Sequence, residues 1–553
     1  MNSECLPFLR IPHTSRLFSD FLYDFSRVRQ FYARAPFETA SHPSTPNSAP
    51  AWLADESRRI AYDSARRARV ADILARQNRA FGCGDATLAS ISRLRNGASA
   101  AVTGQQVGLF AGPLFSVLKA ITAVRIAAEA TRAGADCVPV FWLATEDHDL
   151  AEVNHATLLT SSGELQTLVT SPESAPNAPI RDVRLGADIE TLVAAVAEQL
   201  GPTEAAGWLA ETYRPGATLG AAFAGLFARM FRDWGVILLD ASDPELHAVA
   251  SPLYRDTIRR SASLGQALLA RGKVLTDAGY HEQVKVTASS TLLFAVEDGA
   301  RTPIHRAAAS PTSAGDGGYT IGKRKISEAE LLARIEAGPQ NFSPNVLLRP
   351  VVQDYLLPTL AYTGGPSEVA YFAQVAVVYE QLLGRVTPVL PRFSATIIEP
   401  HVRRLIERYQ LKLTDVFEGQ DHLRSRLAAR TLPAELRAAF DSAGKSLESS
   451  EQSVQAALTK LDPTLVKAAE RAAAKMRYQL NRLRTRAASA ELHRNEILTR
   501  HAQQLSAALC PGHNLQERMI AGIYFISRYG PSLLQSLYDS AQLTCPDHQV
   551  LYV

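Results

Sequence analysis

Apolar residues along the chain follow patterns that predict an α/β core and a long helical region after it. The runs VPVFWLAT (138–145) and GVILLD (235–240) are continuously apolar, which is typical of strands buried on both faces of a parallel sheet. Before the first run, residues 101–134 contain a short apolar stretch, a glycine-containing loop and a helix with apolar residues at helical spacing. Strand, loop, helix and strand in this order predict a right-handed βαβ crossover.

Two segments interrupt this alternation and are expected to be insertions. Residues 157–230 mix turn signals, short β-like runs and a helical stretch. Within residues 265–340, the run 281–304 alternates, is rich in β-forming residues and turns at Glu297-Asp298-Gly299, which predicts hairpins. We therefore expect a core over residues 1–400, interrupted at about 157–230 and 265–340.

The chain is almost entirely helical by pattern from residue 401 to 510. Between residues 476 and 508, apolar residues recur at intervals of three and four, interrupted by Arg494 and His501. This imperfect heptad pattern predicts a helical hairpin or an intermolecular coiled coil. Because a solitary helical arm would expose its apolar seam, we expect a homodimer formed through this region. Residues 511–553 are apolar and aromatic enough to pack back on the core.

Composition excludes several classes of protein. A formal charge of +3 over 553 residues, with arginines scattered along helices, gives no reason to expect a nucleic-acid partner. The chain has no run of about 18 apolar residues and no signal-peptide pattern, so we expect a cytoplasmic protein without a membrane span. The five cysteines are widely spaced without a CxxC pair, which indicates neither a disulfide framework nor a zinc site.

The loop GQQVGLFAGP (104–113) is the first candidate for chemistry. It is neither GxGxxG nor a P-loop, so it predicts no dinucleotide or P-loop chemistry. Gly108 and Gly112 would let backbone amides approach an anion at a helix N-terminus, although a tight structural turn explains them too. The amides of Gln105 and Gln106 suit a polar substrate, and Lys119 is either within reach of an anion or solvated.

The second candidate is the run Glu146-Asp147-His148-Asp149 after a buried strand. Carboxylates beside a histidine could act as a general base, bind an amine or hold a metal. Since His148 and His155 lie seven residues apart, without the HExxH spacing, we expect no metal site. A third group follows another strand: the Gly364-Gly365 loop opens a helix that carries Glu368, Tyr371 and Gln374 on one side.

These motifs resemble those of the bacillithiol biosynthesis cysteine-adding family. The resemblance is carried, in order along nearly the whole chain, by the blocks TGQQVGLFAGPLFSVLKAIT, VPVFWLATEDHDLAEVNH, FSPNVLLRPVVQDYLLPTLAYTGGPSEVAYFAQ and LQER. It implies a Rossmann-like core similar to class I aminoacyl-tRNA synthetases, with two insertions and a C-terminal coiled coil that mediates dimers. It also implies the reaction, which joins cysteine through an amide to the amine of glucosaminyl-malate to form bacillithiol.

The positions of these motifs suggest roles for the candidate residues in that reaction. Asp147, His148 and Asp149 would bind and deprotonate the amine. Substrate would be held by residues of the three motifs: Gln105, Gln106, Gly108, Gly112, Lys119, Glu146, Gly364, Gly365, Glu368 and Gln374. Ligation ordinarily requires ATP, but the chain has GLFAGP in place of HxGH and no clear KMSKS motif, so the sequence does not establish ATP as a cofactor. A nucleotidyltransferase or another ATP-using ligase, and a coiled-coil scaffold that binds a metabolite, are the alternatives.

Overall fold

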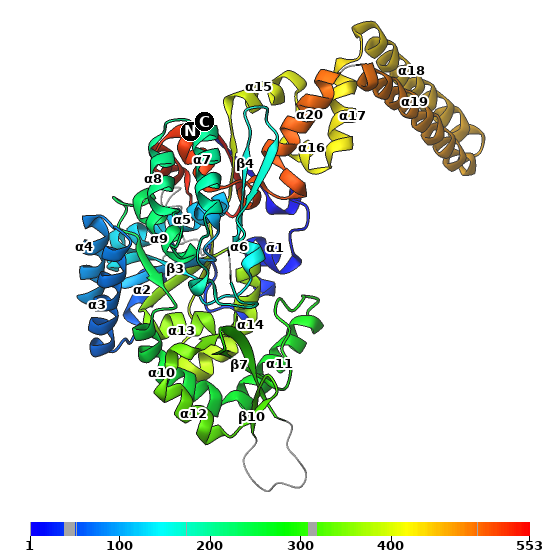
Figure 1. Ribbon diagram of the computed structural model, residues 1–553. Helices are drawn as coiled ribbons and strands as arrows, with labels where there is room; N and C mark the ends of the chain where they lie inside the picture. The colour runs from blue at the N-terminus through cyan, green and yellow to red at the C-terminus, as the bar shows by residue number, and fades with distance from the viewer. Residues whose placement is uncertain (1, 38–49, 51, 173, 308–317, 495) are drawn as a thin grey trace. The chain divides into compact units, whose positions relative to one another are not determined.

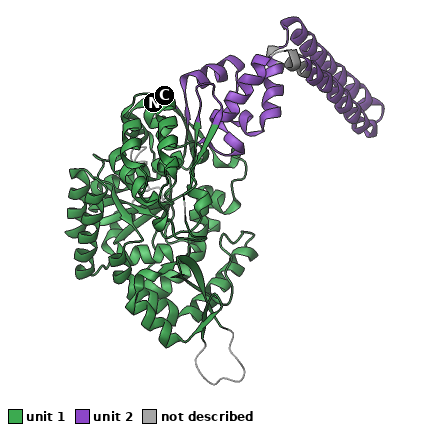
Figure 2. Cartoon of the chain, viewed as in Figure 1, with its two compact units in different colours: residues 1–158, 166–396, 517–551 green, residues 159–165, 397–516, 552–553 purple. Residues whose placement is uncertain are grey.

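The protein is described by a computed structural model that covers residues 2–37, 50, 52–172, 174–307, 318–494 and 496–553. The chain forms two compact units, which Figure 2 shows in different colours. Unit 1 comprises residues 1–158, 166–396 and 517–551, and unit 2 comprises residues 159–165, 397–516 and 552–553. The candidate residues for chemistry all belong to unit 1.

A five-stranded parallel sheet forms the centre of unit 1, and it confirms the predicted α/β class. Its strand order is β13-β12-β2-β3-β6, with β13 Val389–Pro391, β12 Thr359–Gly364, β2 Ser99–Gln105, β3 Cys137–Leu143 and β6 Ile237–Asp240. From β2 the chain adds β3 and β6 on one side, whereas β12 and β13 lie on the other. The strand order therefore reverses between β2 and β12, the point at which open α/β sheets bind ligands.

Helices on the sheet confirm the predicted βαβ elements. Helix α5 (Leu114–Arg132) joins β2 to β3 and packs against both strands. Helix α9 (Leu219–Met230) leads into β6, and the rings of its Phe223 and Phe227 lie 6.2 and 4.7 Å from the ring of Phe141 in β3. Although it lies within the range expected to be an insertion, α9 is thus part of the layer that covers the sheet.

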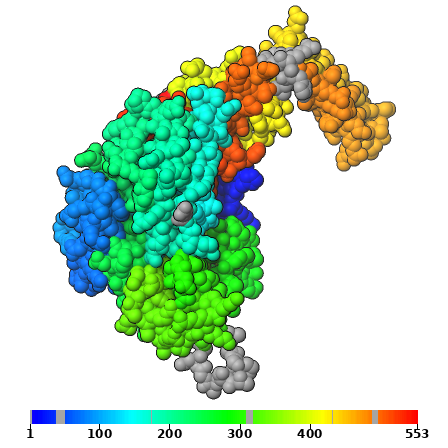
Figure 3. Space-filling model, viewed as in Figure 1, coloured from blue at the N-terminus to red at the C-terminus, as the bar shows by residue number. Residues whose placement is uncertain are grey.

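The two interrupting segments have the expected mixed and β-rich character. The first contains β4 (His155–Leu159), β5 (Leu165–Val169), α7 (Asp188–Leu200) and α8 (Glu204–Thr212), and its residues form much of the surface that faces the viewer in Figure 3. The second follows α11 (Ser261–Asp277) and forms an antiparallel sheet of order β10-β9-β8-β7-β11, with β7 Ser290–Glu297, β8 Ala300–Arg306, β9 Tyr319–Ile321, β10 Arg324–Ile326 and β11 Phe342–Pro344.

In unit 2 the predicted helical region contains a hairpin of α18 (Ala434–Leu461) and α19 (Val466–Arg494), shown in Figure 1. The predicted seam over 476–508 falls on α19 and on α20 (Glu496–Leu509), and residue 495 between them lies outside the described residues. Leu505 and Ala508 are buried on α20, whereas Met476 and Leu483 on α19 are 51% and 58% exposed. Seam positions on α19, together with Ile497 at the start of α20 (55% exposed), are thus exposed for another copy of the chain.

Residues 517–551 belong to unit 1 again. Helix α22 (Gly522–Tyr529) packs against α5, and β15 (His548–Tyr552) lies between β1 (Asn2–Leu6) and β14 (Ala395–Ile398) in a three-stranded sheet. Among the described residues, none of the helices has both the length and the apolar content that crossing a membrane requires.

We expect Gly104→Ala to destabilise unit 1. A Cβ at this position would lie 2.9 Å from both Cβ and the carbonyl oxygen of Trp142 on the paired strand, and a backbone carbonyl cannot move without disturbing the ladder. The expected loss is about 1–3 kcal/mol, measured by urea denaturation. Gly207→Ala in α8 is the matched control, because its added methyl meets no atom within 4 Å and a helical alanine is favoured over glycine. Equal stability of the two variants would contradict the expectation.

Candidate active site

A pocket of about 650 Å³ opens at the carboxyl ends of the parallel strands. Residues that follow β2, β3, β12 and β13 line it, including Gln105, Gln106, Glu146, Asp147, Gly365, Glu368 and Arg392. Its other walls come from the second insertion, from α13 (Arg349–Leu356) and from the C-terminal segment, which contribute Phe294, Arg301, Arg349 and Arg518. The pocket thus brings together residues from all three predicted motifs, at the point where the strand order reverses.

Lys119 of α5 joins the two strands that flank this point. Its Nζ lies 2.7 Å from the carbonyl oxygen of Gly104, 2.9 Å from Oε1 of Gln105 and 2.6 Å from Oε2 of Glu368. Burial lowers the pKa of Lys119 to about 8, against the raising effect of Glu368. An ammonium group has three hydrogens, and these three acceptors use them all. In this arrangement Lys119 positions pocket residues, and its contact with a substrate anion stays a prediction.

Glu368 is held by several donors at the start of α14 (Pro366–Leu383). Its Oε2 accepts the Gly365 N–H at 2.7 Å, and its Oε1 accepts the hydroxyl of Tyr362. Burial alone would raise the pKa of Glu368, but Lys119, Tyr362 and the Gly365 amide together hold it below its usual value. Because both carboxylate oxygens already have donors, Glu368 supports the shape of the pocket.

Asp147 and His148 form a hydrogen-bonded group with an arginine from the second insertion. Asp147 Oδ2 accepts from Nε2 of Gln106 at 2.8 Å, and Oδ1 accepts from the His148 N–H at 2.8 Å. Nη1 of Arg301 lies 3.4 Å from Asp147 Oδ1 and 3.1 Å from Nδ1 of His148, and its guanidinium stacks on the ring of Phe294. With a permanent donor at Nδ1, the neutral imidazole carries its proton on Nε2.

Glu146 differs from its neighbours because it lies against a second buried titratable group. Its Oε1 is 3.4 Å from Nε2 of His247 in α10 (Pro244–Arg259), and neither atom has a hydrogen-bond partner among the described residues. Burial raises the pKa of Glu146 to about 8, although Arg301 and Arg181 oppose the shift. Burial also lowers the pKa of His247 to about 3. The pocket therefore contains a carboxyl group that is neutral at pH 7 and lies close to the pH at which it can exchange a proton.

Three further arginines line the pocket: Arg349, Arg392 and Arg518. The guanidinium of Arg392 donates to Glu517 at 3.0 and 2.5 Å, and Glu517 also accepts from Ser394 at 2.9 Å. Nη2 of Arg349 donates to the Tyr371 hydroxyl at 3.0 Å. Arg518 forms no ion pair with any residue that the structure describes. Arg349 and Arg518 are therefore available to an anionic substrate.

The hydrogen bonds of the glycine loop favour the structural turn, one of the two interpretations that the sequence leaves open. Gly108 and Gly112 are buried outside the pocket lining. The Ala111 N–H donates to the Tyr213 hydroxyl at 3.2 Å, and the N–H groups of Gly112 and Leu114 donate to the carbonyl oxygens of Leu109 and Ile520 at 3.0 and 2.8 Å. Backbone amides that are already bonded cannot bind a phosphate or a carboxylate.

Other predicted residues also lie outside the lining of the pocket. Asp149 is exposed and caps α6 (Leu150–Val153) by accepting the Glu152 N–H at 3.3 Å. The Gln374 amide is bonded on both sides to the backbone of Val284, at 2.9 Å each, so that it holds the second insertion instead of a ligand. Gly364 ends β12, where a side chain would collide with Glu368. His148 reaches the site only through Asp147 and Arg301.

Sequence reasoning missed Arg301, Arg349 and His247. Arg301 lies on an insertion strand, and His247 lies inside an ordinary amphipathic helix, so neither has a motif around it. Arg518 belongs to the LQER block and Arg392 follows a predicted strand, but nothing in the sequence indicated that the two arginines face one pocket.

Comparisons with known proteins cover the whole chain. Residues 1–393 match the family model described as bacillithiol biosynthesis BshC, N-terminal Rossmann-like domain, and residues 395–553 match the model for its C-terminal coiled-coil domain. Similar proteins are found in Koribacter versatilis, 47% identical over 553 residues and 100% of both chains, and in Solibacter usitatus, 35% identical over 555 residues and 100% of both chains. A third, from Salinibacter ruber, is 32% identical over 97% of this chain and 96% of its own. All three are named "Putative cysteine ligase BshC".

We expect Glu517→Gln to weaken unit 1 strongly. The substitution keeps the size of the side chain but leaves the buried Arg392 guanidinium without its counter-charge. Removing one partner of a buried pair costs about 3–5 kcal/mol, which chemical denaturation followed by circular dichroism would measure. Asp277→Asn is the control, because its pair with Lys273 is exposed on both sides and should contribute less than about 1 kcal/mol. A loss for Glu517→Gln no larger than that of the control would contradict the assigned role.

Proposed function

The chain belongs to the bacillithiol biosynthesis BshC family, and on that premise we propose that it is a ligase that joins L-cysteine through an amide to the amine of glucosaminyl-malate. One observation of the structure supports this activity most: the acid–base group Glu146 and the arginines Arg349 and Arg518 line the same pocket. Amide formation needs a group that accepts the proton of the attacking amine. The malate part of the acceptor has two carboxylates, and binding them requires positively charged side chains.

Glu146 is the group that we assign to proton transfer. In the reaction, the amine nitrogen attacks the carbonyl carbon of an activated cysteine carboxyl group, the leaving group departs from that carbon, and one amine proton passes to the Glu146 carboxylate. His247 lies behind Glu146 and keeps it away from water. Asp147 has His148 and Arg301 fixed around Oδ1, but its side chain is 36% exposed and its Oδ2 has one donor, Gln106, so that Oδ2 is placed to accept a further hydrogen bond from the amine.

The arginines are assigned to the carboxylates of the acceptor. Arg349 and Arg518 lie on the pocket wall without a counter-charge of their own in the described structure, whereas Arg392 is already paired with Glu517. An arginine fork matches a carboxylate in shape and charge. The glycine loop offers a triphosphate few donors, because the amides of Gly108, Ala111 and Gly112 are bonded within the protein. We therefore assign no step to ATP.

We also propose that the protein acts in the cytoplasm as a homodimer. The exposed apolar residues of α19, Met476 and Leu483, support self-association through the helical hairpin.

The assignment of Glu146 predicts a pH dependence. Its carboxyl group is protonated at pH 7 and becomes a base as the pH rises through about 8, so kcat/KM should increase over that range. Glu146→Gln should lower kcat by about 10²–10⁴-fold and remove this increase. Glu198→Gln, a change at an exposed position of α7, is the control and should keep the parental profile. A Glu146→Gln enzyme with the parental pH profile would refute the assignment.

The reaction itself can be tested with the purified chain. When it is incubated with cysteine, glucosaminyl-malate and ATP, we expect mass spectrometry to detect an amide-linked thiol product. Release of AMP or of ADP in the same samples would identify how the carboxyl group is activated. If the folded protein formed no product from this acceptor but coupled cysteine to another amine, the proposed substrate would be wrong. If it coupled nothing, the proposed ligase activity would be wrong.

A further inference from the structure

Two cysteines and an aspartate meet where β1 and β15 run side by side. Cys5 is on β1, and Cys545 and Asp547 precede β15. The sulfur atoms of Cys5 and Cys545 lie 3.5 Å apart, and both cysteines are free thiols. One oxygen of Asp547 and the two sulfurs all lie within 4.8 Å of one another. Residues 540 positions apart in the sequence thus place three metal-binding atoms together.

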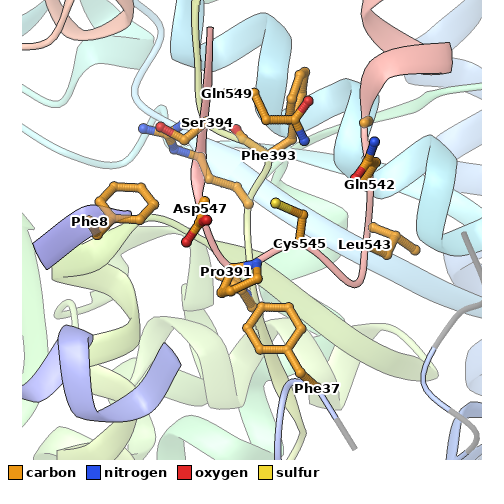
Figure 4. A pocket seen from close by; sticks show the side chains of 13 residues that line it. Phe8, Phe37, Pro391, Phe393, Ser394, Gln542, Leu543, Cys545, Asp547 and Gln549 are labelled. Carbon is orange, nitrogen blue, oxygen red and sulfur yellow. Dashed lines mark hydrogen bonds between the residues drawn. The ribbon is translucent and has the colours of Figure 1, made fainter. Parts of the chain in front are cut away.

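The surroundings fix the carboxylate of this group. The Tyr23 hydroxyl donates to Oδ1 of Asp547 at 2.8 Å, and it accepts the Phe8 N–H at 2.8 Å. Cys545 and Asp547 also line a small cavity with Phe8 and Pro391, which Figure 4 shows. A carboxylate oriented by a second hydrogen-bonded group is a common feature of protein metal sites.

We propose that Cys5, Cys545 and Asp547 bind a thiophilic divalent cation, of which Zn²⁺ fits best. Two sulfurs held at about 2.3 Å from zinc in a tetrahedral arrangement lie about 3.8 Å from each other, which is close to the separation found here. Zinc also accepts mixed thiolate and carboxylate ligands. The exposed side of Cys5 gives the cation access, and water can occupy the fourth position.

The two cysteines are thiols that lie within hydrogen-bond distance of each other. The sulfurs are too far apart for a disulfide, which needs about 2.0–2.1 Å. Two thiolates beside a carboxylate repel one another in the absence of a cation, whereas a bound dication neutralises them. Bound to both β1 and β15, the cation would join the two strands.

The test is zinc binding by the reduced, metal-stripped full-length chain. Competition with a chromophoric chelator should show one equivalent of Zn²⁺ bound, and Co²⁺ should produce a thiolate charge-transfer band. Cys5→Ser, Cys545→Ser and Asp547→Asn should each weaken binding more than tenfold. Tyr23→Phe should weaken it by about 10–100-fold through the orientation of Asp547. Cys83→Ser, which changes a free cysteine outside the group, should bind as the parent does.

Zinc should also raise the thermal midpoint of the parent and of Cys83→Ser, but not that of the double variant Cys5→Ser/Cys545→Ser, because a ligand stabilises the state that binds it. Equal zinc affinity in the parent and the double variant would overturn the proposal. So would a reduced parent that takes up no zinc and forms only a disulfide when diamide is added. Both results are binding measurements, so they do not depend on the ligase activity proposed above.

Discussion

The buried ammonium group of Lys119 is the interaction on which the pocket depends. The order of the strands reverses between β2 and β12, so the loops after these strands separate and leave a crevice. The ammonium group of Lys119 bridges that crevice. It donates to Gly104 and Gln105 at the end of β2 and to Glu368 after β12. An isolated buried charge would be costly, but here it is paired and hydrogen-bonded at every proton. The two loops are thereby connected through one side chain, and residues that follow both strands line the same pocket.

The remainder of the pocket comes from segments that a minimal parallel-sheet fold does not contain. The second insertion supplies Arg301, which fixes Asp147 and His148, and Gln374 anchors that insertion to α14 through the backbone of Val284. The C-terminal segment returns to unit 1 and contributes Glu517, which holds Arg392, and Arg518. The sheet therefore determines where the pocket lies, and the additions determine its charge. This division explains how a common core can carry a particular chemistry.

The sequence predicted the parts of this arrangement that depend on local pattern. Buried strands such as 138–145, the helix after Pro113 and the helix that carries Glu368 were read from hydrophobic spacing, and the acidic run followed a strand end as expected. The role of the glycine loop stayed open because hydrogen bonds from its amides to Tyr213 and Ile520 depend on residues about 100 and 400 positions away. The group of Cys5, Cys545 and Asp547 was not predicted for a similar reason. Metal-binding motifs are recognised in a sequence by closely spaced ligands, whereas Cys5 and Cys545 are 540 positions apart.

Neighbouring carboxyl groups in the acidic run have different environments, and this decides which of them can transfer a proton. Asp147 accepts from Gln106, from the His148 amide and from Arg301, so its charge is satisfied by fixed donors. Asp149 faces solvent as a helix cap. Glu146 alone turns inward against a neutral imidazole, with one oxygen that has no donor among the described residues. A base must gain and lose a proton during each cycle, and a carboxylate held by three donors is poorly suited to that role. The chemistry that the motif suggested for Asp147, His148 and Asp149 is therefore better assigned to Glu146, with Asp147 as the group that holds the amine in place.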